Sequence, residues 1–176
     1  MAASRTAGIG GEDVVGIDDD GWFDSGGMVV RPDWIDYNGH MNVGYYVVAF
    51  DQATEAVCAH LGVGEAYRRQ ADASMFVVEA HVVYEREVME SSPLVFRSRV
   101  VDFDAKRLHL LHRMFHAGEG YLAATNELMC LHVDLSKRRA APFPDDAMDR
   151  VRALGEAHAR HAPTAGVGRA IGLRRD

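Results

Sequence analysis

The sequence predicts an α+β fold, in which an antiparallel five-stranded sheet wraps around a long central helix and a C-terminal helix follows. Three observations lead to this prediction. Over residues 44–61, apolar side chains recur three and four positions apart, as on one face of a helix. Four later segments alternate with the period of two that strands have. Turns of three or four residues join the last three of these segments, so these strands must be antiparallel.

The chain of 176 residues suggests a single domain. Residues 1–26 are rich in glycine and aspartate and show no period, which predicts a flexible leader. Residues 27–161 then form the folded domain, which opens with a short strand over 28–33 that Pro32 interrupts. The 44–61 helix follows and ends at the glycines of the next turn.

The remaining elements follow from the same periods. Residues 64–74 (GEAYRRQADAS) are compatible with a second short helix or with a loop. The strand pattern covers residues 75–87, 93–103, 107–116 and 121–134. A last helix is expected over about 145–160, with Asp145 or Asp146 as its N-cap, and residues 162–176 form a loose tail.

The predicted sheet needs a cover for its apolar face, and the 44–61 helix is the long apolar element available. Such a sheet also leaves edge strands open to pairing with another chain. We therefore expect a homodimer or a dimer of dimers.

Composition excludes several classes of protein. The net charge of −7 and the absence of a basic cluster in the body of the chain argue against a nucleic-acid face. No apolar run reaches the roughly 18 residues of a membrane span, and the start of the chain lacks the apolar region of a secretory signal. A reduced cytoplasm is the expected compartment, with Cys58 and Cys130 as small buried residues outside any CxxC pair.

Known cofactor motifs are missing as well. The chain has no GxGxxG, P-loop, GxSxG or HExxH sequence. His112 and His116 are four residues apart, a spacing that would suit two metal ligands on a helix. They lie in a strand pattern, however, so we interpret them as ordinary strand histidines. We expect neither a metal nor a cofactor.

The stretch WIDYNGHMNVGYY, residues 34–46, carries the chemistry. Asn42 suits the N-cap of the following helix, whereas Asp36 comes too early to cap it. Free backbone N–H groups at the helix start, near Val43 and Gly44, can hold a developing oxyanion. A carboxylate base beside such donors is the minimum equipment for hydrolysing an acyl bond.

The sequence DYNGHMNVGYYVVAFDQA resembles the D-x-x-G-H-V/M-N-x-x-x-Y signature of hotdog-fold acyl-CoA thioesterases of the 4-hydroxybenzoyl-CoA thioesterase type. The matching residues are Asp36, Gly39, His40, Met41, Asn42 and Tyr46, and the likeness covers about 28–137. The sequences FVVEAHVVYEREV and LHVDL further resemble the betainyl-CoA thioesterase branch, which is related to the thioesterase part of some carnitine dehydrogenases and hence to carnitine metabolism.

The resemblance implies roles for the residues of this stretch. Asp36 is the catalytic carboxylate, acting as base or as nucleophile, and the Val43 N–H is the oxyanion donor. His40 and Asn42 are grouped with these catalytic residues, Asn42 mainly as the cap of the helix and His40 mainly as a residue that supports the structure of the turn. Family members often have a second asparagine where this chain has Val43, so only the backbone role carries over. Another hotdog branch uses an acid on the central helix, which makes Asp51 or Glu55 the fallback.

A trimethylammonium acyl group would be recognised by aromatic faces. Trp34, Tyr37 and Tyr45 lie close to Asp36 in the sequence, and we expect Phe76 to join them from the sheet. Glu79 is a further candidate to line a pocket at the sheet. The alternative is that it lies on a solvent-exposed face of its strand. The phosphates of CoA need basic partners, for which Lys106 and Arg107 at a hairpin, or the arginines of the tail, are candidates.

Two alternatives remain. A hotdog enoyl-CoA hydratase has the signature D-x-N-P-x-H, but Gly39 replaces the proline here and His40 comes one residue too early. A non-catalytic acyl-CoA binding protein would have no need for Asp36. Hydrolysis of a short or polar acyl-CoA, such as betainyl-CoA, is therefore the favoured function.

Overall fold

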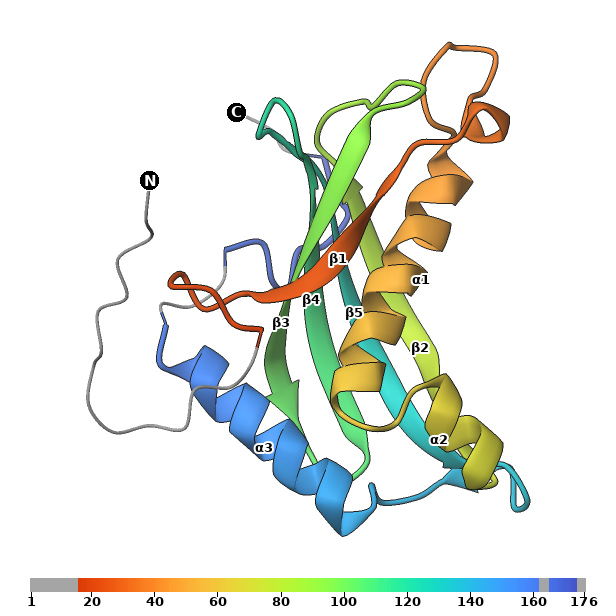
Figure 1. Cartoon of the computed structure of the whole chain (residues 1–176), viewed down its shortest axis with the longest axis vertical. Helices are drawn as coiled ribbons and strands as arrows, with labels where there is room; N and C mark the ends of the chain where they lie inside the picture. Colours follow the sequence, from red (N-terminus) through yellow and green to blue (C-terminus); the bar gives the residue numbers. More distant parts are fainter. Residues whose placement is uncertain (1–15, 162–164, 174–176) are drawn as a thin grey trace, which may run out of the picture.

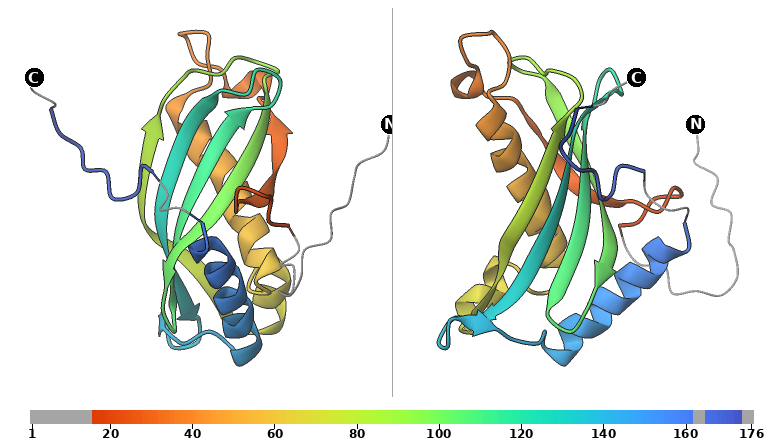
Figure 2. Two further views of the ribbon diagram at one scale, coloured as in Figure 1. Left: turned by 90° about the vertical axis from the view of Figure 1, so that its left-hand side faces the viewer. Right: turned by 180° about the vertical axis from the view of Figure 1, so that it is seen from behind.

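The computed structural model describes residues 16–161 and 165–173. A curled antiparallel sheet wraps around one long helix, α1 (Val43–His60), and two shorter helices lie at one end of the molecule (Figures 1 and 2). The predicted α+β arrangement, with a sheet around a central helix and a C-terminal helix, is confirmed.

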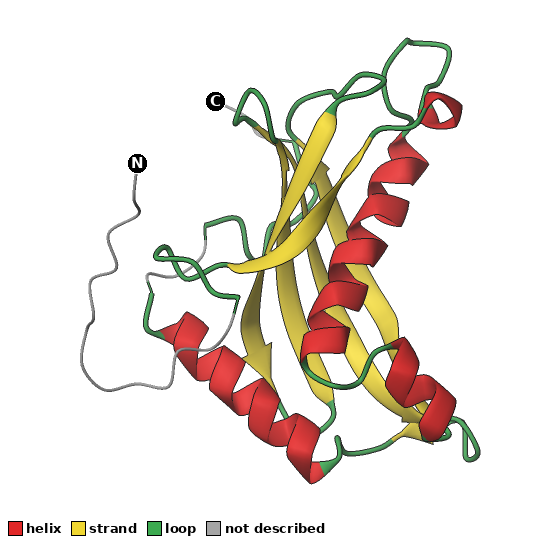
Figure 3. Cartoon of the chain, viewed as in Figure 1, coloured by secondary structure: helices red, strands yellow, loops and turns green. Residues whose placement is uncertain are grey.

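The sheet has six strands, one more than predicted. They are β1 (Phe23–Val29), β2 (Ala73–Tyr84), β3 (Pro93–Phe103), β4 (Arg107–His116), β5 (Leu122–Asp134) and the two-residue β6 (Arg139–Ala140). Their order is β1-β3-β4-β5-β2, every pairing is antiparallel, and β6 pairs with the end of β5. β1 and the long strand β2 are therefore the two edges of the sheet (Figure 3).

Strand β1 begins at Phe23, inside the segment that we expected to be a flexible leader. Its pairing with β3 shifts register between Asp24 and Gly27, and a Cβ atom at Gly27 would lie 2.5 Å from the Leu94 carbonyl oxygen. This close approach requires glycine, so the strand lacks the alternation that reveals the others. Residues 1–15 of the expected leader lie outside the described residues.

Helix α1 buries one face against the sheet. Its buried residues are Tyr46, Ala49, Phe50, Ala53, Thr54, Val57 and Cys58. Phe50 packs edge-on against Phe96 of β3, with ring centroids 5.9 Å apart. Both cysteines are free and buried, as predicted, and burial raises the pKa of the Cys130 thiol to about 12.

The two other helices close the end of the sheet near the C-terminus of α1. Residues 64–74, for which the sequence allowed either a short helix or a loop, contain the short helix α2 (Glu65–Gln70). Helix α3 (Asp145–Ala159) packs on β3, where the His158 Nδ1 atom accepts a hydrogen bond from the Val100 N–H. The expected cap at Asp145 or Asp146 is wrong, because Pro144 holds the N-cap position and both acids lie in the first turn.

A buried chain of hydrogen bonds joins β1, β3, β4 and α1 through the core. The Thr54 hydroxyl donates to the Phe50 carbonyl and so accepts from His112 Nε2 at 3.1 Å. The His112 Nδ1 atom then accepts from the Ser98 hydroxyl at 2.5 Å, and Ser25 donates to Ser98 at 2.6 Å. His112 is thus a neutral core histidine, and burial lowers its pKa to about 3.

Candidate active site

The turn from Ile35 to Asn42 holds Asp36 at the N-terminal end of α1. An isolated bridge pairs Ile35 with Met41, and the Asp36 N–H donates to the His40 carbonyl at 3.1 Å. Gly39 adopts a φ of +85° and donates its N–H to the Asp36 carbonyl. The Asp36 carboxylate is half-buried and accepts from the Asn38 N–H at 2.8 Å, so one oxygen is fixed by the turn.

The predicted cap at Asn42 is confirmed. Its side-chain oxygen accepts from the Gly44 N–H at 3.0 Å, and its backbone N–H donates to the Trp34 carbonyl at 2.9 Å. Val43 is the first helical residue and is exposed, and a first-turn N–H has no acceptor within its own helix. Among the described residues no acceptor binds the Val43 N–H, so this group can bind an anion at the positive end of the helix dipole.

His40 lies in the same turn, but among the described residues its side chain forms no hydrogen bond with Asp36. Its Nδ1 atom lies 3.4 Å from the Met41 carbonyl, and its Nε2 atom lies 4.0 Å from a carboxylate oxygen of Glu87. The imidazole is thus directed to the segment that follows β2. A role in positioning the turn fits this geometry better than proton transfer at Asp36.

Two of the four expected aromatic residues come together. Trp34 is buried, and the Tyr45 ring stacks on it with centroids 5.3 Å apart. The Arg31 guanidinium also lies over the Trp34 ring, at 5.8 Å. Tyr37 is 97% exposed and encloses nothing within the protomer. A closed aromatic cage around Asp36 is therefore not formed by one chain.

The expectation that Phe76 joins this group is wrong within one protomer. The hydroxyl of Tyr84, at the end of β2, donates to the Val43 carbonyl at 3.3 Å. Phe76 lies eight residues earlier on the same strand, roughly 25 Å away along it.

Glu79 is exposed and opposite Met129, on the face of the sheet away from α1. It does not line the cavity between α1 and β2.

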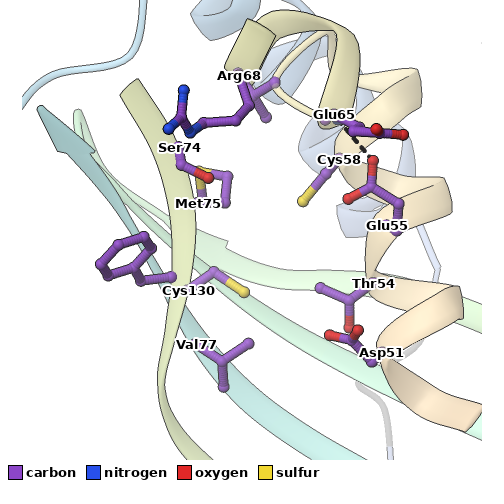
Figure 4. Close-up of a pocket in the computed structure, with 13 residues that line it drawn as sticks. Asp51, Thr54, Glu55, Cys58, Glu65, Arg68, Ser74, Met75, Val77 and Cys130 are labelled. Atoms are coloured by element: carbon purple, nitrogen blue, oxygen red, sulfur yellow. Dashed lines mark hydrogen bonds between the residues drawn. The ribbon is translucent and has the colours of Figure 1, made fainter. Parts of the chain in front are cut away.

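That cavity, of about 500 Å³, lies beside the C-terminal half of α1. Asp51, Thr54 and Cys58 line it from α1, and Met75 and Val77 face them from β2 (Figure 4). Glu55 and Glu65 add two further carboxylates. Glu55 accepts from the Glu65 N–H at 2.8 Å, whereas no partner is recorded for the Asp51 carboxylate within the described chain. The fallback acids thus share one cavity, with Asp51 the freer of the two.

The hairpin candidates for CoA phosphates are partly occupied. Arg107 contacts the Asp104 carboxylate through Nε at 2.7 Å and through a terminal nitrogen at 2.6 Å. These bonds hold the pKa of Asp104 at about 2. The charge of Arg107 is therefore already balanced, whereas Lys106 has no ion-pair partner among the described residues.

An antiparallel sheet wraps around a long helix, and a turn with a carboxylate precedes the N-terminus of that helix. These features define a hotdog-fold protein of the class that acts on acyl thioesters. The chain belongs to the thioesterase-like superfamily, whose family model matches residues 30–151. The family expected from the sequence signature is thereby confirmed.

Relatives of known function narrow the comparison. The chain is 40% identical over 144 residues to a betainyl-CoA thioesterase of Pseudomonas aeruginosa, covering 82% of this chain and 91% of that protein. It is 33% identical to an L-carnitine dehydrogenase/betainyl-CoA thioesterase of Rhizobium meliloti, matching 83% of this chain but only 29% of the larger protein.

Solved structures agree on the fold. A putative thioesterase from Pseudomonas putida KT2440 is 31% identical, with a TM-score of 0.74 over 88% of this chain and 98% of that chain. The Staphylococcus aureus protein SAV2348, solved in complex with CoA, superimposes with a TM-score of 0.80 over 87% of this chain and 96% of that chain. At 24% identity, the second comparison supports the fold alone.

Proposed function

We propose that this protein is an acyl-CoA thioesterase that hydrolyses betainyl-CoA to betaine and CoA. The observation that carries the proposal is the half-buried Asp36 carboxylate, which lies in a fixed turn beside the Val43 N–H at the start of α1. The 40% identity to a betainyl-CoA thioesterase over most of both chains supports the substrate.

Asp36 acts in one of two ways. As a base, it takes a proton from water while the water oxygen attacks the thioester carbon. As a nucleophile, its own oxygen attacks to give an anhydride, which water then cleaves. In both routes the carbonyl oxygen becomes negative and accepts a hydrogen bond from the Val43 N–H. The C–S bond breaks as this oxyanion collapses, which in the second route is the step that forms the anhydride, and CoA leaves as a thiolate that takes up a proton.

The active unit that we propose is a homodimer paired through the edges of β2. β2 is a twelve-residue edge strand with exposed apolar side chains at Val77 and Val78, and α1 exposes Val47 and Val48 beside it. Two-fold pairing of identical strands is antiparallel. It would bring the Asp36 turn of one protomer to the C-terminal half of the partner's α1, because α1 is only about 27 Å long.

This arrangement would place Asp36 of one protomer at the acidic cavity of the other. Asp51, Glu55 and Glu65 give the cavity a negative lining that suits the trimethylammonium group of a betainyl chain. The stacked Trp34–Tyr45 pair adds aromatic surface near the reacting carbonyl.

Within the described residues no helix is long and apolar enough to cross a membrane. We place the reaction in the cytoplasm, without nucleic-acid or membrane partners.

A thiol-release assay with three CoA esters tests the proposal. Betainyl-CoA should release thiol, and its neutral isostere 3,3-dimethylbutyryl-CoA should react more slowly. Crotonyl-CoA serves as the third substrate: its hydration without thiol release would favour the hydratase alternative. Tight binding of all three with no reaction would favour a non-catalytic binding protein.

Asp51→Asn separates recognition of the cation from catalysis. If Asp51 recognises the cation, kcat/KM should fall for betainyl-CoA and stay unchanged for the neutral isostere. If Asp51 is instead the catalytic acid, both substrates should lose activity alike. Cys58→Ala, a change in the same cavity that leaves its charge intact, is the matched control.

A further inference from the structure

A second hollow lies where β5 turns into β6, on the far side of the β2 edge from the acidic cavity. It measures about 560 Å³. Its lining residues are Arg68, Asp72, Phe76, Leu131, Val133, Leu135, Arg138, Arg139 and Ala140. We call it the arginine groove. It combines an apolar floor with three arginines and one acid.

The floor of the groove suits a flat aromatic ligand. Phe76 is directly opposite Leu131 in the pairing of β2 with β5, so both side chains lie on the same face of the sheet. Phe76 is 46% exposed, which is unusual for a phenylalanine inside a sheet. An exposed aromatic face can stack on any nucleobase, because every base has a π-face.

The three arginines of the groove are available for an anion. No carboxylate partner within 4 Å is recorded for Arg68, Arg138 or Arg139 in the described chain, and all three are exposed. Their neighbours differ, because Arg69 pairs with Glu65 and Lys137 pairs with Asp134. Guanidinium groups bind phosphate through paired N–H donors, so three of them at one site favour a ligand with more than one phosphate.

The hairpin that carries two of these arginines is rigidly held. Asp134 accepts from the Lys137 N–H and from the Ser136 hydroxyl, which locks the turn. Arg138 then takes a φ of +49°, a left-handed conformation that is strained for a non-glycine residue. Glycine or asparagine would hold this position with less strain, so an arginine there has a cost that ligand binding would offset.

Buried His132 fixes the two walls of the groove to each other. Its Nδ1–H donates to the Ala141 carbonyl at 2.9 Å, and its Nε2 atom accepts from the Tyr67 hydroxyl at 3.0 Å. Tyr67 precedes Arg68 on α2, and Ala141 follows β6. The groove is therefore preformed rather than assembled around its ligand.

The groove and the acidic cavity share two lining residues, Arg68 and Phe76. Arg68 extends from α2 toward Ser74 at the start of β2 (Figure 4). A ligand held in the groove can thus continue past these two side chains into the cavity beside α1. This continuity favours a long ligand with a nucleotide at one end over a free nucleotide.

We propose that the arginine groove binds the 3′-phosphorylated adenine nucleotide of CoA, with adenine on Phe76 and the phosphates at Arg68, Arg138 and Arg139. The proposal rests on the proposed function, because that function supplies a CoA ester as substrate. It replaces Arg107 by these three arginines as the phosphate-binding group.

Calorimetry with CoA and with adenosine 3′,5′-bisphosphate tests the groove without any turnover. The double variant Arg138→Asn/Arg139→Gln should raise both dissociation constants at least about tenfold, because charge-assisted hydrogen bonds are lost. Asparagine tolerates the left-handed conformation, so the fold should survive. Arg152→Gln on α3 is the matched loss of an exposed arginine and should leave both constants unchanged. Equal binding by the double variant and the wild type would overturn the proposal.

Kinetics separate this proposal from the proposed function. The double variant should raise KM for betainyl-CoA at unchanged kcat, and should hydrolyse betainyl-pantetheine, which lacks the nucleotide, as the wild type does. Equal loss on both substrates would overturn the groove assignment and leave the thioesterase intact. Conversely, a wild type that binds CoA through the groove but hydrolyses no ester would support the groove and overturn the thioesterase.

Discussion

Asn42 shows how a single residue sets up the turn that carries Asp36. Its side chain caps α1 while its backbone N–H closes the turn onto Trp34, so the residue fixes both the helix start and the loop that carries Asp36. This cap was predictable from the sequence, because an asparagine before an apolar helical pattern acts locally. The position of Phe76 was not predictable, because periodicity gives the face of a strand but not the distance to another segment.

Replacing Asn42 by alanine should destabilise the protein by about 1 kcal/mol through loss of the helix cap. The same change should lower kcat, because the Val43 N–H loses its fixed direction. Urea unfolding and thiol release measure the two effects. Asn42→Asp keeps an acceptor at the cap and should retain most of the stability, so equal destabilisation by both changes would contradict this role.

At the scale of elements, the buried chain from Ser25 to Thr54 attaches α1 to three strands. Helix α1 and strands β2 to β5 were predictable because their apolar residues follow one clear period. Strand β1 was missed at its start, because Gly26 and Gly27 break the pattern where the strand bulges against β3. The polar chain itself joins residues 14 to 73 positions apart, for which a single sequence contains no signal.

The core histidines should make stability depend on pH. Burial lowers the pKa of His112 to about 3 and, with nearby Arg99, that of His158 to about 4. The unfolded chain binds these protons below about pH 6.5 and the folded chain does not, so stability falls as the pH drops from 7 toward 4. At pH 5 the loss from His112 alone should be about 2 kcal/mol.

Urea midpoints at pH 7.5 and pH 5 measure this dependence. His112→Gln should show a smaller difference between the two pH values than the wild type, whatever its absolute stability. His81→Gln, at a partly exposed position on β2, is the control and should keep the wild-type difference. An unchanged difference in His112→Gln would show that His112 is not the source.

At the scale of the whole molecule, the two sheet edges differ in a way that predicts one interface. β1 is short, bulged and rich in glycine, which discourages pairing, whereas β2 is long and exposes apolar residues.

The fold could be predicted from the sequence, since element order and signature agree. The arginine groove could not, because its arginines come from α2 and from the β5–β6 hairpin, about 70 positions apart.

Adding a charge to each edge in turn tests the interface. Val78→Lys, at a position 56% exposed on β2, should convert the proposed dimer to a monomer and abolish activity, since each proposed site needs both chains. Val29→Lys, at a position 54% exposed on β1, should change neither. Light scattering with circular dichroism reports assembly and folding. A fully active monomer would contradict the two-chain site.

We propose that the Asp36 carboxylate performs the hydrolysis, and thiol release from betainyl-CoA by Asp36→Asn measures this role. Asparagine keeps the size of the side chain and an acceptor for the Asn38 N–H, so the turn should persist while base and nucleophile are both lost. Asp33→Asn removes an exposed carboxylate three residues earlier and is the matched control. We expect kcat to fall by about 10²–10⁴-fold in Asp36→Asn and to stay near the wild-type value in Asp33→Asn. Thiol release by a folded Asp36→Asn at the wild-type rate would contradict it.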